Sequence, residues 1–246
     1  MKTEAVLSVG MWSTGRHLQP LKQRLEAENI PVHIIEFDRS NLKKMRASDY
    51  ARQYRSFFEA RREQDIKFLT ISHSMSTIYN QLADDSRIIT RILMSPAPVL
   101  GIGEPPITFS EAVERASTLP MFLSSTLKPD KKLAEKFAVN CHAKQGLPWD
   151  LDVPPESRKT LFDIVCGIKV PKRENVHVIV GEEDKLTPQR IARALNRYHN
   201  GNSSPGTIHL FPRNDHYSVL QTKEVLDEVA RIATNYASTY SSPVTA

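Results

Sequence analysis

Short apolar runs alternate with longer amphipathic stretches along most of this chain. The apolar runs, which predict strands, lie at residues 4–10, 31–38, 67–71, 91–95, 175–181 and 206–211. Between them, apolar residues recur at intervals of three and four, which predicts helices at 16–28, about 48–64, from 78 onward, 189–198 and 219–236. Since strands that alternate with helices form parallel sheets covered on both faces, we expect an α/β fold with a mostly parallel sheet.

The alternation stops between about residues 99 and 172. Prolines divide this segment into short helical pieces, and it contains no convincing strand. The alternation of strands and helices then resumes. We therefore expect a core built from residues 1–98 and 173–246, with residues 99–172 inserted as a helical cap.

The composition is that of a globular protein. The 246 residues are 40% hydrophobic and 25% charged, which is ordinary for one substantial domain. No apolar run approaches the roughly 18 residues that a membrane span needs, and the N-terminus lacks the layout of a secretory signal. The two cysteines, Cys141 and Cys166, provide neither a disulfide framework nor a metal cluster. We expect a cytoplasmic protein.

The chain is mildly basic, with a formal net charge of +5, and part of this charge is concentrated between Lys128 and Arg173. These side chains form either a solvated helical surface or a docking face for an anionic substrate or an acidic partner. No nucleic-acid-binding motif accompanies them, so we expect no nucleic-acid partner.

The most informative segment for chemistry is Ser72-His73-Ser74-Met75-Ser76, where an apolar strand ends and a helical pattern begins. Ser74 has a small residue two positions away on each side. A serine on a strained strand-to-helix turn requires such neighbours, because the strand and the helix pass close to its backbone. Serines stand here where glycines are usual. We interpret the segment as a nucleophile elbow.

Two later loops carry the groups that a nucleophilic serine needs. Asp184 lies in the loop after a late predicted strand, and His216 lies in the loop after the last one. A serine hydroxyl is a weak nucleophile at neutral pH, so it requires a base to take its proton and an acid to orient that base. Among the other histidines, His73 is expected to point away from the pocket, and His17 and His199 to lie on the surface.

In these features the chain resembles the α/β-hydrolase superfamily with a helical cap. The resemblance covers nearly all of the chain and indicates no particular subfamily. It implies that Ser74 attacks a carbonyl group, that His216 acts as the base and that Asp184 orients the imidazole. It also implies an oxyanion hole formed by the backbone N–H groups of Met11 and Met75. Such chemistry needs no metal and no organic cofactor.

A mostly apolar pocket is expected around the nucleophile. The candidate contacts lie near the serine and in the cap: Met11, Trp12, Met75, Met121, Phe122, Trp149, Leu186 and Tyr217. Trp12 would equally well pack against the sheet, and the three cap residues would equally well form a small core of the cap itself. An apolar pocket favours an acyl chain or an aromatic ester over a sugar or a peptide.

Three functions are compatible with the sequence. The first is a serine hydrolase that cleaves a small carboxylic ester or thioester through an acyl-enzyme. The second is a thioesterase or carrier-linked esterase whose basic cap receives coenzyme A or an acidic acyl carrier. The third keeps the fold for lyase, cyclase or binding chemistry, and the serines at positions 72 and 76 leave it open.

Overall fold

A computed structural model of the protein describes residues 2–10, 13–37, 46–97, 170–184, 187, 189–201 and 207–240. Within these ranges the chain forms a six-stranded sheet in which paired strands are parallel. The strands are β1 (Lys2–Ser8), β2 (Val32–Ile35), β3 (Ile66–His73), β4 (Ile88–Met94), β5 (Val176–Gly181) and β6 (Ile208–Phe211). Their order across the sheet is β2-β1-β3-β4-β5-β6. The α/β class expected from the sequence is confirmed.

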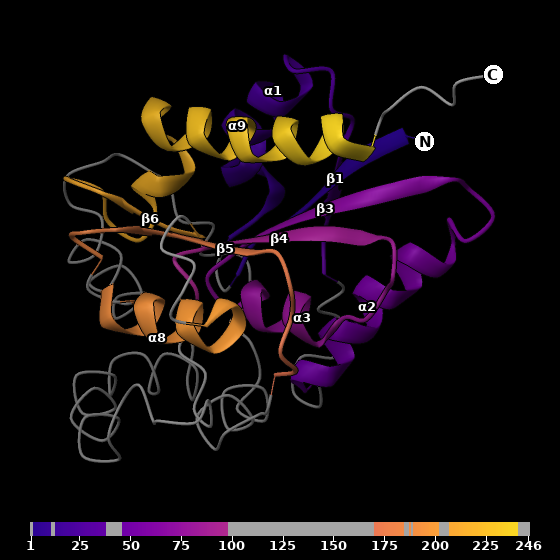
Figure 1. Ribbon diagram of the computed structural model, residues 1–246, viewed down its shortest axis with the longest axis horizontal. Helices are drawn as coiled ribbons and strands as arrows, with labels where there is room; N and C mark the ends of the chain where they lie inside the picture. The colour runs from indigo at the N-terminus through magenta and orange to yellow at the C-terminus, as the bar shows by residue number, and fades with distance from the viewer. Residues whose placement is uncertain are drawn as a thin grey trace.

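Helices cover both faces of this sheet (Figure 1). One face carries α1 (Gln19–Glu26) and α9 (Lys223–Tyr240), and the other carries α2 (Ala47–Glu59), α3 (Ser76–Leu82) and α8 (Gln189–Asn200). Each face has its own buried apolar layer, because successive side chains of a strand point to opposite sides. Thus Phe68 of β3 packs with α2 and α3, whereas Leu69 and Ile71 pack with α1 and α9.

Two helices begin later than the sequence pattern indicates. The predicted helix at 16–28 starts with a 3-10 turn, η1 (Gly15–Leu18), and the α-helix begins only at Gln19. Pro20 explains this boundary, since its ring excludes it from the interior of an α-helix but suits the first turn. The helix predicted at 219–236 is likewise preceded by a 3-10 turn, η3 (Ser218–Leu220).

The strand order places the candidate site. β2 and β3 lie on opposite sides of β1, so the chain reverses direction across the sheet between them. In open parallel sheets a crevice forms outside the carboxyl ends of the strands at such a reversal. The loop after β1 and the turn after β3, which carries Ser74, therefore meet at this edge.

The segment expected to form the cap, residues 99–172, lies outside the described residues as far as position 169. Val170, at the end of that segment, is buried in the apolar layer that includes α8. Its carbonyl accepts a hydrogen bond from the Tyr198 hydroxyl at 2.7 Å. Within the described ranges, no helix combines the length and the apolar character needed to cross a membrane.

Candidate functional site

Ser74 lies on a sharp turn between β3 and α3. Its φ of +56° is in the left-handed region, which costs a residue other than glycine about 1–3 kcal/mol. Neighbouring elements hold the turn in place: the Ser74 N–H donates to the Met94 carbonyl at 3.0 Å, and the Ser74 carbonyl accepts the Thr77 hydroxyl at 2.6 Å. A strained turn of this kind presents the serine hydroxyl at the carboxyl edge of the sheet.

The serines on either side of this turn make hydrogen bonds inside the protein. The Ser72 hydroxyl accepts a hydrogen bond from the Asn80 side-chain amide at 2.9 Å. The Ser76 hydroxyl accepts from the His73 N–H at 3.1 Å and lies 3.0 Å from the Ser8 carbonyl. Both serines are buried. These flanks therefore tie β1, β3 and α3 together.

Gly10, in the loop after β1, lies directly against the turn. A Cβ atom at this position would lie 2.7 Å from the backbone nitrogen of Met75 and 2.8 Å from the Cβ of Ser74. Atoms at these distances overlap, so a side chain at position 10 would push the loop away. Glycine is therefore what brings the loop after β1 beside the Met75 N–H.

Ser74, His216 and Asp184 form a continuous chain of hydrogen bonds. His216 Nε2 lies 3.0 Å from Ser74 Oγ, and His216 Nδ1 lies 2.9 Å from Asp184 Oδ2. A carboxylate can only accept, so Nδ1 carries the proton and Nε2 offers its lone pair to the serine hydroxyl. The Asp184 side chain is fully buried, and 6% of the His216 side chain is exposed.

Asp184 is held in its ionised form. Burial by itself raises the pKa of a carboxyl group, but the electrostatic attraction and hydrogen bond of the His216 imidazole and the N–H of Thr187 keep the pKa of Asp184 below its ordinary value. The Thr187 N–H donates to Asp184 Oδ1 at 2.7 Å, and the Thr187 hydroxyl donates to the Pro96 carbonyl at 2.9 Å. The Thr187 N–H thus holds the carboxylate oxygen that lies slightly farther from His216 Nδ1, at 3.2 Å against 2.9 Å.

The loops that carry Asp184 and His216 are in direct backbone contact. The Glu183 N–H donates to the Asn214 carbonyl at 2.9 Å. Gly181, at the end of β5, lies so close that a Cβ atom there would be 2.0 Å from the Asn214 carbonyl oxygen. Only a residue without a side chain allows the two loops to approach in this way.

We expect the substitution Gly181→Ala to destabilise the protein strongly. The added methyl group meets backbone rather than a flexible side chain, so the loop after β6 has to move. The expected cost is about 3 kcal/mol in the free energy of unfolding, measured by urea denaturation. Gly201→Ala is the control, because nothing lies within 4 Å of a Cβ there. Its positive φ alone should cost about 1–2 kcal/mol. A loss at Gly181 no larger than at Gly201 would contradict this account.

Only part of the predicted substrate pocket falls within the described residues. Outside them lie Met11, Trp12, Met121, Phe122, Trp149 and Leu186. Met75 is described, and its backbone nitrogen lies beside Gly10. Tyr217 is buried, with its ring centroid 4.9 Å from that of His216 and 5.2 Å from that of His73. The substrate contacts assigned to all eight residues stay predictions.

The sequence interpretation missed two residues near the site. Thr187 fixes the second oxygen of Asp184, and the spacing Asp-x-x-Thr, typical of an aspartate that accepts a nearby backbone N–H, was the available signal. His73 was expected to point away from the pocket, and no partner was predicted for it. Its Nε2 atom lies 2.6 Å from the backbone carbonyl oxygen of His216. No local pattern announces this contact, because the partners are 143 residues apart.

The expectation that His17 and His199 lie on the surface is wrong. Their exposed fractions are 9% and 3%. His199 Nε2 lies 2.7 Å from the Gln81 side-chain oxygen, and its Nδ1 accepts the Arg173 N–H at 3.1 Å. A histidine on a helix reads as polar in a sequence pattern. Its ring can nevertheless be buried wherever both nitrogens find partners.

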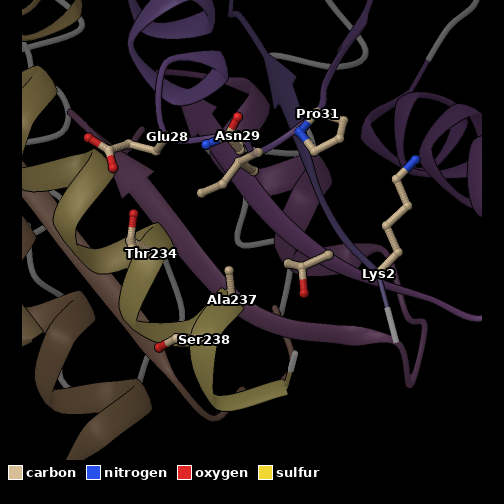
Figure 2. Close-up of a pocket in the computed structure, with 9 residues that line it drawn as sticks. Lys2, Glu28, Asn29, Pro31, Thr234, Ala237 and Ser238 are labelled. Carbon is tan, nitrogen blue, oxygen red and sulfur yellow. The ribbon is translucent and has the colours of Figure 1, made fainter. Parts of the chain in front are cut away.

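A separate cavity of 580 Å³ lies away from these residues (Figure 2). It is lined by the start of β1, the segment before β2 and the last turns of α9, with Lys2, Asn29, Pro31 and Ser238 among its residues. These are the amino ends of parallel strands, so the cavity lies at the edge opposite Ser74.

Within the described ranges, no group of three or more histidine, cysteine or acidic side chains is arranged to hold a metal ion.

Comparison with solved structures identifies the fold. A pyrethroid hydrolase from Sphingobium faniae JZ-2 is 15% identical, with a TM-score of 0.63 over 95% of this chain and 98% of that one. A monoacylglycerol lipase from Paleococcus ferrophilus is 19% identical, with a TM-score of 0.58 over 97% of this chain and 96% of that one. A polyneuridine aldehyde esterase is 15% identical, with a TM-score of 0.61 over 95% and 99% of the two chains.

These likenesses extend over nearly the whole chain, which therefore has the α/β-hydrolase fold. The resemblance inferred from the sequence is confirmed at this level. No protein-family profile matches the chain. No curated protein matches it either. Function has therefore to be argued from the site itself.

Proposed function

We propose that the protein is a serine hydrolase that cleaves a carboxylic ester or thioester through an acyl-enzyme. The observation that carries the proposal is the hydrogen-bonded chain from Ser74 Oγ through His216 to Asp184, at 3.0 Å and 2.9 Å. These lengths allow proton transfer without a rearrangement of the side chains. The three solved structures compared above are described as a hydrolase, a lipase and an esterase, which agrees with this class of reaction.

Each of the three residues has a role that follows from its position. Ser74 attacks the carbonyl carbon of the substrate while His216 Nε2 takes the hydroxyl proton. The imidazolium that results is stabilised by the ionised Asp184 carboxylate. His216 then gives the proton to the leaving alcohol or thiol, and later activates the water that hydrolyses the acyl-enzyme.

The attack places a negative charge on the carbonyl oxygen, and N–H donors have to stabilise it. We assign one donor to the backbone of Met75, which lies beside Gly10. We assign the second to Met11, the residue that follows this glycine. Each such donor contributes about 3–4 kcal/mol to the stability of the transition state. The apolar part of the proposed substrate rests on the side-chain types expected around Ser74.

A fluorophosphonate probe tests the reaction class directly. We expect the probe to label Ser74, because it reacts only with a serine that a neighbouring base activates. Mass spectrometry of the labelled peptide locates the modified residue. The Ser74→Ala variant is expected to stay unlabelled. Ser72→Ala is the matched control and should be labelled, because the hydroxyl that it removes is buried against Asn80.

The other two functions correspond to different outcomes. A folded protein that takes no label and is inert towards a panel of p-nitrophenyl esters would support lyase, cyclase or binding chemistry. A protein that is labelled at Ser74, but hydrolyses only carrier-linked or coenzyme A thioesters in a salt-sensitive way, would support an acidic carrier as the substrate.

A further inference from the structure

His73 makes a buried contact that the proposed mechanism does not use. The side chain is fully buried, and its Nε2 lies 2.6 Å from the backbone carbonyl oxygen of His216. A carbonyl oxygen can only accept a hydrogen bond, so Nε2 carries the proton and donates it. This hydrogen bond joins the residue next to the nucleophile to the residue that carries the base.

The imidazole of His73 has few other polar contacts. Its Nδ1 has no hydrogen-bond partner among the described residues, and the ring centroid lies 4.8 Å from that of His216. A buried nitrogen without a partner costs free energy, which a leucine of similar size would avoid. The benefit of a histidine here therefore comes through Nε2.

Two other contacts of the loop after β6 join it to the loop after β5 rather than to the turn that carries Ser74. These contacts are the hydrogen bond from Glu183 to Asn214 and the close approach of Gly181. They place the base relative to the acid. The His73 bond comes from β3, the strand that leads into the nucleophile, and the backbone of His73 is itself held by the Ser76 hydroxyl.

We infer that His73 is a positioning residue, whose hydrogen bond to the His216 carbonyl sets the distance between the serine hydroxyl and the imidazole. The inference rests on the proposed function and deepens it. His73 touches neither the substrate nor a reacting atom. It acts by tying the backbone of His216 to the residue that directly precedes Ser74.

Two amide substitutions test this inference, because they differ only in reach. In His73→Gln the side-chain nitrogen is as many bonds from Cβ as Nε2 of histidine, so it can still donate to the His216 carbonyl. In His73→Asn the nitrogen is one bond too short. We expect His73→Gln to keep kcat for p-nitrophenyl esters within about 10-fold of the wild type and His73→Asn to lose about 100-fold, with KM unchanged in both.

A third variant, His73→Leu, fills the space without a donor and keeps the test decisive if the asparagine variant does not fold. We expect it to lose about 100-fold in kcat as well. Equal kcat values for the glutamine and asparagine variants, or a wild-type kcat in His73→Leu, would overturn the inference. The inference would also be overturned if the variants lowered the midpoint of urea unfolding and left kcat unchanged.

Crystallography separates this inference from the proposed function. We expect the distance from Ser74 Oγ to His216 Nε2 to stay near 3.0 Å in His73→Gln and to exceed 3.5 Å in His73→Leu. An unchanged distance in His73→Leu overturns the inference whatever the protein catalyses. A wild-type protein that takes no fluorophosphonate label would instead remove the proposed function.

Discussion

The substitution Ser74→Ala is expected to lower kcat for p-nitrophenyl ester hydrolysis by about 10⁵-fold or more, with little change in KM. In the proposed mechanism Ser74 Oγ forms the bond to the acyl group, and among the described residues no other group within hydrogen-bond distance of His216 Nε2 could replace it. His216→Ala should lose a similar factor, because the serine hydroxyl without a base is a weak nucleophile.

The double variant Ser74→Ala/His216→Ala provides the sharper measurement. Residues that act as one unit are not additive, so the double variant should be no slower than either single variant. Ser72→Ala is the matched control and should keep kcat within about 10-fold, because it removes one buried hydrogen bond to Asn80 worth about 1 kcal/mol. Losses that multiply in the double variant would show that the two residues do not share a reaction step.

The second large effect is expected in acid. Burial, together with a smaller electrostatic contribution from the neighbouring imidazole of His216, lowers the pKa of His73 to about 3. Burial also lowers the pKa of His199 to about 3, with smaller contributions from Arg91 and Arg173. Each of these histidines has an ordinary pKa of 6.5 in the unfolded chain.

The sign of the effect follows from these values. Above pH 6.5 both histidines are neutral in the folded and unfolded states, so they do not lower the free energy of unfolding. Below pH 6.5 the unfolded chain binds protons that the folded protein excludes down to about pH 3, so stability falls over this range. At two pH units below 6.5, each histidine has lowered the free energy of unfolding by about 2.7 kcal/mol. Together they approach the whole free energy of unfolding of a typical domain, about 5–15 kcal/mol.

Urea denaturation between pH 8 and pH 4.5 measures this loss. We expect the curve of unfolding free energy against pH for His199→Gln to be less steep than the wild-type curve by about 1.4 kcal/mol per pH unit below pH 6, which corresponds to one proton. The comparison with the wild type cancels the contributions of the other titratable groups. Parallel curves for the two proteins would show that His199 is protonated in the folded state.

The fold could be predicted from the sequence because its signals are local. Strand and helix periods, read over a few residues each, determine an alternation that only a covered parallel sheet satisfies. Ser74 was identified in the same way, since the small residues around it and the change of period mark a strained turn. Asp184 and His216 were found because loops after parallel strands meet at one edge of the sheet. These inferences needed no knowledge of distant contacts.

The remaining features depend on residues that are far apart in the chain. The bond from His73 to His216 spans 143 positions, and that from His199 to Gln81 spans 118. The sequence around a histidine does not show whether both ring nitrogens will find hydrogen-bond partners, so His199 was assigned to the surface. The role of Thr187 depends on where the Asp184 carboxylate points, which only the packed loops decide.

By itself the sequence determined the layered sheet, the turn that presents Ser74 and the loops from which an acid and a base could reach it, because periodicity and small residues act over short distances. The tertiary structure alone decided the 3.0 Å and 2.9 Å separations of the three side chains, and which histidines are buried. Those features depend on close approaches such as that of Gly181 to Asn214, where a single added carbon atom would move one loop away from the other.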